Sequence, residues 1–151
     1  MEEINGTIYI KKVFKASIEE VWTAWTDPDR VMLWFGSDPQ GSVLFATLDV
    51  KLGGCFKITF KDADLTEHTC SGKYLEVLEF NKLCFTWNWK SEPGVESYIT
   101  IVFQAEGNST HMQFEHDKTR TESKHAYYKG WLSTFSKLER MLNSGFDPGF
   151  L

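Results

Sequence analysis

The chain has 151 residues, of which 42% are hydrophobic and 25% charged, and its formal net charge is -5 at pH 7. These values fit one globular domain, which we expect to span residues 1–151. The acidic balance argues against nucleic-acid binding, which needs a basic surface. Because no run of about 18 apolar residues occurs, no membrane span is expected.

The N-terminus and the cysteines point to a cytoplasmic protein. Residues 1–4 lack the basic and apolar regions of a signal peptide. Cys55, Cys70 and Cys84 are widely spaced and form no CxxC pair, so we expect three reduced thiols. The histidines show no metal-ligand spacing, and we expect neither a metal site nor a cofactor.

The N-terminal part predicts one strand followed by two short helices. Residues 6–15 alternate between polar and apolar side chains, which is typical of a strand. Ser17, with Glu20 three residues later, forms a capping box that starts a helix. Asp27 and the proline after it start a second helix, which ends at Gly36.

The middle of the chain predicts strands joined by short turns rich in glycine, proline and asparagine. These six strands are expected over residues 43–49, 55–61, 67–79, 82–90, 96–106 and 109–117. Because the connections are short, the sheet should be antiparallel.

The C-terminal part predicts one long helix, over about residues 122–143. Trp131, Phe135, Leu138 and Leu142 recur on one face of it. Such a helix would be about 33 Å long, which is enough to cross a whole sheet. We therefore expect an α+β fold in which a curved, seven-stranded antiparallel sheet grips this helix and leaves a space suited to a ligand.

Several motifs resemble, in order, those of the SRPBCC superfamily of START-like proteins. The resemblance is closest to the branch named after the activator of the heat-shock-protein ATPase. The motifs lie at residues 13–28, 34–36, 49–56, 72–77, 83–87 and 129–131. This resemblance implies a helix-grip fold like that of the birch-pollen allergen. Founding members carry a separate N-terminal domain that engages the chaperone, whereas this sequence begins at the first strand. A co-chaperone or stress-response role is therefore a secondary implication.

Aromatic side chains on facing surfaces suggest a ligand site. Trp87 and Trp89 share one face of a strand, and Trp131 and Phe135 share one face of the long helix. The residues expected to line the site are Trp34, Phe35, Phe56, Trp87, Trp89, Phe103, Phe114, His116, Tyr127, Trp131 and Phe135. Trp34 and Phe35 would form a lid. Ordinary core packing is the alternative for each of these rings.

The leading functional hypothesis is non-enzymatic binding of a small hydrophobic molecule, such as a lipid, a polyketide-like aromatic or a terpenoid. One alternative is a cyclase or dehydratase, for which an inward-facing His116 is the candidate base, although a hydrogen-bonded structural histidine is the simpler interpretation. Another is a protein-interaction domain, for example a homodimer formed through a sheet edge. A titratable group held by an orienting partner inside the cavity would favour catalysis.

Overall fold

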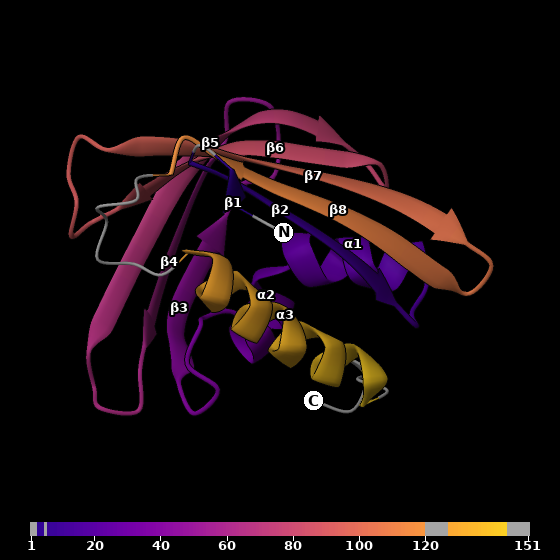
Figure 1. Ribbon diagram of the computed structural model, residues 1–151, viewed down its shortest axis with the longest axis horizontal. Helices are drawn as coiled ribbons and strands as arrows, with labels where there is room; N and C mark the ends of the chain where they lie inside the picture. The colour runs from indigo at the N-terminus through magenta and orange to yellow at the C-terminus, as the bar shows by residue number, and fades with distance from the viewer. Residues whose placement is uncertain (1–2, 5, 120–126, 145–151) are drawn as a thin grey trace.

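The computed structural model describes residues 3–4, 6–119 and 127–144. Figure 1 shows one sheet curved over the C-terminal helix. The strands are β1 (Glu3–Ile4), β2 (Thr7–Phe14), β3 (Ser42–Leu48), β4 (Cys55–Lys61), β5 (Glu67–Leu78), β6 (Lys82–Trp89), β7 (Glu96–Glu106) and β8 (Ser109–Asp117). The helices are α1 (Ile18–Thr26), α2 (Pro28–Trp34) and α3 (Tyr127–Asn143).

The expected α+β helix-grip fold is confirmed, with all seven predicted strands in one antiparallel sheet. The strand order is β1-β2-β8-β7-β6-β5-β4-β3, in which the two-residue β1 adds an eighth, outermost strand. α3 ends at Asn143, as predicted. Its expected start at 122 falls outside the described residues.

Local sequence signals explain how the two short helices begin. The Ser17 hydroxyl accepts a hydrogen bond from the Glu20 backbone N–H, and the Glu20 carboxylate accepts one from the Ser17 backbone N–H, so the capping box is complete. The Asp27 side chain caps α2 by accepting from the Asp29 N–H. The buried Trp34 indole then donates to the Ala24 carbonyl, which ties α2 to α1.

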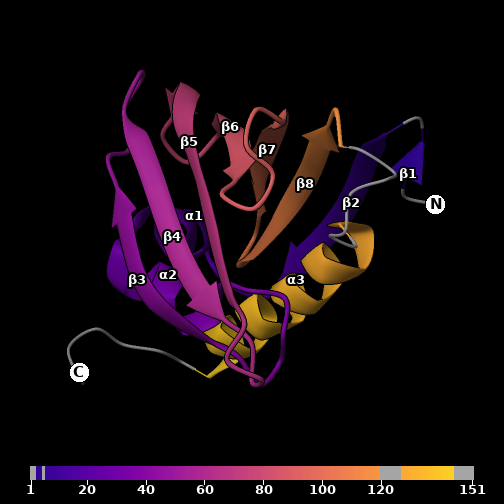
Figure 2. The same cartoon turned by 90° about the vertical axis from the view of Figure 1, so that its left-hand side faces the viewer.

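All three helices lie on the concave side of the sheet (Figures 1 and 2). α3 buries Trp131, Phe135 and Leu138 against it. On β8, Met112, Phe114 and His116 alternate inward as the period of two predicts, and all three are buried. Within the described residues, no helix is both long and apolar enough to cross a membrane.

Candidate ligand-binding site

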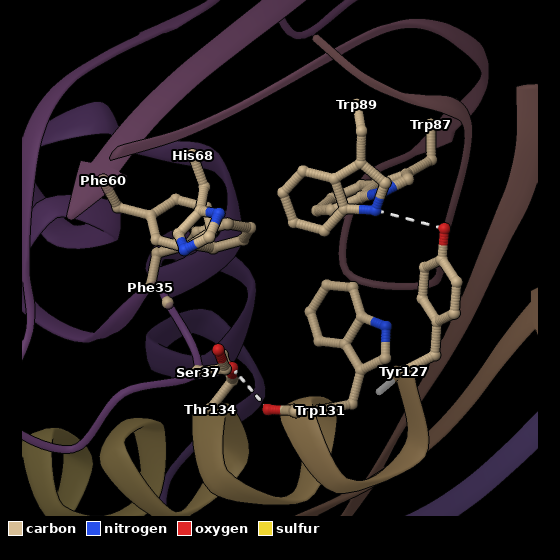
Figure 3. A pocket seen from close by; sticks show the side chains of 11 residues that line it. Phe35, Ser37, Phe60, His68, Trp87, Trp89, Tyr127, Trp131 and Thr134 are labelled. Atoms are coloured by element: carbon tan, nitrogen blue, oxygen red, sulfur yellow. Dashed lines mark hydrogen bonds between the residues drawn. The ribbon is translucent and has the colours of Figure 1, made fainter. Parts of the chain in front are cut away.

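A cavity of about 80 Å³ lies between α3 and the concave face of the sheet and opens to solvent on one side. Its aromatic lining comes from the loop after α2, from the strands β4 and β6 and from α3. These side chains are Phe35, Phe60, Trp87, Trp89, Tyr127 and Trp131. His68, two glycines and two hydroxyl side chains complete it. Figure 3 shows Phe35, Phe60 and His68 facing the three tryptophans across the open space.

The strand register brings the two sides of the cavity together. Phe60 of β4 lies directly opposite His68 of β5, and their rings are 5.3 Å apart. Trp87 and Trp89 project from β6 on the same face, with ring centroids 5.2 Å apart. The Trp89 indole donates to the Tyr127 hydroxyl at 3.1 Å, which connects β6 to the first turn of α3.

The loop after α2 is fastened to α3 by three hydrogen bonds. The Lys137 ammonium donates to the carbonyls of Gly36 at 3.1 Å and Asp38 at 2.9 Å. The Ser133 hydroxyl donates to the Ser37 carbonyl at 2.6 Å. Burial lowers the pKa of Lys137, and the nearby Asp38 carboxylate opposes that shift. These bonds hold Gly36 and Ser37 at the rim of the cavity.

A histidine–carboxylate pair borders the cavity. His68 Nε2 lies 2.8 Å from Oδ2 of Asp62, and both side chains are partly buried. Asp62 follows β4 and His68 lies in β5, so the hairpin between these strands brings the two together. The sequence pattern places Asp62 in a turn between two strands, where an aspartate is usually solvated. The hairpin register, which places residue 61 opposite residue 67, is the signal that could have revealed the pair.

His116 is buried away from this cavity in a complete chain of hydrogen bonds. The Trp131 indole donates to Nδ1 at 3.0 Å, and Nε2 lies 2.7 Å from the Ser97 hydroxyl. Because an indole N–H only donates, Nδ1 accepts and the proton of the neutral ring is on Nε2, donating to Ser97. Ser97 in turn donates to the Trp87 carbonyl. Both ring nitrogens are used for structure.

Burial lowers the pKa of His116 to about 3, against a smaller opposing effect of Asp117. The side chain has no exposed surface. His116 is therefore neutral at physiological pH and makes no contact with a molecule in the cavity.

A comparison with models of protein families shows the family to which the chain belongs. The family model described as "Activator of Hsp90 ATPase homolog 1-like protein" matches residues 15–143. The chain belongs to this family. No curated protein matches the sequence.

Solved structures of other proteins share the fold of this Activator of Hsp90 ATPase homolog 1-like chain. A protein of Chromobacterium violaceum is 21% identical, with a TM-score of 0.80 over 92% of this chain and 98% of the other. An AHSA1-like protein of Aeromonas hydrophila is 21% identical, with a TM-score of 0.78 over 92% and 93%. A protein of Rhizobium leguminosarum is 24% identical, with a TM-score of 0.79 over 91% and 94%. At these identities the likeness shows the fold alone.

In this Activator of Hsp90 ATPase homolog 1-like domain, five of the eleven expected site residues line the cavity. They are Phe35, Trp87, Trp89, Tyr127 and Trp131. Phe56 instead lines a second, apolar space of about 20 Å³. Phe35 and Trp87 line both spaces, with ring centroids 6.1 Å apart, so these two rings form the partition between them.

The other five expected residues lie elsewhere in the core. Trp34 is buried between α1 and α2, where it holds the helices together instead of covering the cavity. Phe103 packs edge-on against Trp22 of α1. Phe114 and Phe135 pack behind Trp131. With His116, these residues line neither of the two spaces in the described part of the chain.

The geometry of the described residues gives little support to a metal site or to a cysteine nucleophile. Among the described residues, no group of three or more histidine, cysteine, aspartate or glutamate side chains could hold a metal ion. The three cysteines are free thiols, of which Cys70 is buried and Cys55 exposed. Burial raises the pKa of Cys70, so its nucleophilic thiolate is disfavoured.

Proposed function

We propose that the protein binds a small molecule, or one end of a larger one, in the aromatic cavity between α3 and the sheet. The observation that carries this proposal is the cavity itself, an opening of about 80 Å³ surrounded by six aromatic side chains. Burial of an apolar group there would be driven by about 25 cal/mol per Å² of surface removed from water, before the entropic costs of binding.

The size of the cavity narrows the ligand class. Pockets for drug-sized ligands enclose roughly 300–1,000 Å³, whereas this space is about 80 Å³. It accommodates a group no larger than a small ring or a branched methyl cluster. A whole lipid or terpenoid would need the partition formed by Phe35 and Trp87 to move. With the rings as they stand, a longer molecule would seat one end in the cavity and leave the rest outside.

Gly130 supports a binding role. It lies inside α3 and lines the cavity. Glycine in a helix interior destabilises the helix by about 1 kcal/mol relative to alanine. A Cβ added at this position would meet only Ser37 Cβ at 3.4 Å, which is ordinary contact. Packing in the described structure therefore does not demand a glycine here, and we infer that it keeps space open for a ligand.

Substitution of Gly130 separates folding from binding. Gly130→Ala should stabilise the protein by up to about 1 kcal/mol in denaturant unfolding, because alanine favours the helix. Gly130→Leu should fill the cavity and abolish binding of benzene, the probe used. Binding can be followed through the NMR signals of the indole N–H groups. Those of Trp87, Trp89 and Trp131 should shift with benzene in the wild type. That of Trp22, which packs against Phe80 and Phe103, should not.

Two results would contradict this proposal. One is a wild-type protein whose cavity tryptophans do not respond to benzene or to any other small apolar probe. The other is unchanged benzene binding in a folded Gly130→Leu variant. Either would favour an interaction domain, the role suggested by the family's description as activators of a chaperone ATPase.

The His68–Asp62 pair favours a second candidate function, general-base catalysis on a molecule in the cavity. An orienting carboxylate on a cavity histidine is the arrangement that proton abstraction requires. A cyclase or dehydratase would use it. Under this alternative, His68→Gln should abolish turnover of a bound substrate and leave its affinity within about twofold. Non-enzymatic binding predicts no turnover in either protein.

A further inference from the structure

We propose that the cavity selects a small organic cation, specifically a quaternary ammonium group, in preference to a neutral group of the same shape. This inference rests on the proposed binding function and names the chemical class of its ligand. Three independent features of the cavity lead to it: the use of its hydrogen-bond donors, the arrangement of its rings and the charges around it.

Three hydrogen-bond donors of the lining side chains are committed to the protein. The Trp89 indole donates to the Tyr127 hydroxyl, and the Trp131 indole donates to His116 Nδ1. The Thr134 hydroxyl donates to the Gly130 carbonyl at 2.8 Å. The Trp87 indole N–H has no hydrogen-bond partner among the described residues, but its nitrogen is buried and has almost no accessible surface. An anion or a carbonyl would thus find few donors, whereas ring faces and oxygen lone pairs attract positive charge.

The rings form walls around the space. Trp87 and Trp89 are at 87° to each other, Trp87 and Trp131 at 62°, and Phe60 and Trp89 at 61°. Rings inclined in this way surround a guest from several directions instead of stacking in one column (Figure 3). The negative quadrupole faces of several rings around one cation are the basis of quaternary ammonium recognition.

Negatively charged carboxylates lie close to the cavity, and they favour a bound cation. The Asp62 carboxylate lies 2.8 Å from Nε2 of His68, which lines the cavity. Hydrogen bonds from the backbone N–H groups of Ala63 and Gln40 lower the pKa of Asp38, and one from Thr66 lowers the pKa of Asp64. These two groups therefore stay ionised at neutral pH.

Lys137 is the opposing charge at this rim. Its ammonium is directed at the Gly36 and Asp38 carbonyls and is partly compensated by the Asp38 carboxylate. Among the described lining residues there is no lysine, arginine, aspartate or glutamate. A cation would therefore meet aromatic rings first, with the carboxylates of the surrounding loops behind them.

A pair of isosteric probes tests the charge preference. Choline carries a trimethylammonium group, and 3,3-dimethylbutan-1-ol carries a neutral tert-butyl group of the same shape. Titration of each into the wild-type protein, followed by the probe's methyl proton signal, should show choline binding at least fivefold more tightly. Its methyl signal should move upfield, because the ring currents of the surrounding aromatics shield it.

Variants of Trp89, which is only partly buried, measure how much its aromatic ring contributes to choline binding. Trp89→Leu should weaken choline at least fivefold and weaken the neutral alcohol by a clearly smaller factor, because leucine keeps a smaller apolar surface but has no π face. Trp89→Phe should retain most of the choline affinity. Trp22→Leu, a substitution on α1 outside the cavity, should leave both affinities unchanged.

The outcomes separate this inference from the binding proposal. Equal or tighter binding of the neutral alcohol would overturn the cation preference and leave the apolar binding site intact. If choline fails to bind while benzene binds, the cation preference is likewise wrong. If benzene, choline and the alcohol all fail to move the cavity tryptophan signals, both proposals fail.

Discussion

His116 shows how one buried side chain can make stability depend on pH. Its folded pKa of about 3 lies below its ordinary value of 6.5, so the unfolded chain binds the proton more readily. The stability that neutral His116 contributes is fully present above about pH 6.5 and is lost as the pH falls toward 3. Protonation would also place a hydrogen on Nδ1, directly facing the Trp131 N–H.

We therefore expect the free energy of unfolding to fall by about 2 kcal/mol between pH 7 and pH 5 because of this one residue. Denaturant unfolding at several pH values measures the change. His116→Gln serves as the reference, because subtracting its pH profile removes the contributions of all other groups. Parallel profiles for the two proteins would mean that His116 is accessible to protons in the folded state.

The helix-grip fold depends on the packing of α3 against the sheet. Leu138 is fully buried on its sheet-facing side, whereas Leu132 on the same helix is 39% exposed. Leu138→Ala should lower the free energy of unfolding by roughly 2–5 kcal/mol, since it removes buried methyl groups and leaves a cavity. Leu132→Ala should change it by less than about 0.5 kcal/mol. Similar losses in both variants would show that α3 is not anchored through this face.

The bounds of a helix or strand could be predicted from the sequence where its side-chain pattern and its flanking turn residues are strong. The strands 55–61, 96–106 and 109–117 have the expected bounds, because alternating side chains and strong turn residues define both ends. The two-residue β1 is too short to show any periodicity. It exists because it pairs with β2.

The candidate site was harder to predict, because its residues depend on contacts between elements. The alternation of side chains along the strand and the spacing along the helix predicted that Trp87 and Trp131 face each other. Their ring centroids are indeed 5.3 Å apart. The same patterns could not show that Phe114 and Phe135 pack behind Trp131 instead of facing the cavity. The His68–Asp62 contact needs the hairpin register, which a single strand pattern does not give.

At the scale of the whole molecule, the described sheet and helices border two neighbouring small spaces, and Phe35 and Trp87 line both of them. Under the proposed binding function, a larger cavity would require Phe35 or Trp87 to move, because these two side chains line both spaces. The loop that carries Phe35 stays fastened to α3 by Lys137 and Ser133.

The pairing of β2 with β8 also has a consequence for how the chain is made. β2 is the first long strand to leave the ribosome, yet its long partner in the sheet, β8, is the last of the described strands to be synthesised. At about 5–20 residues per second, translation from Phe14 to Asp117 takes on the order of ten seconds. Through that time Ile8 and Ile10, buried in the finished domain, lack the β8 residues that lie opposite them in the sheet. The nascent chain must therefore hold an open apolar strand until the final hairpin emerges, and the domain closes only after most of it has been translated.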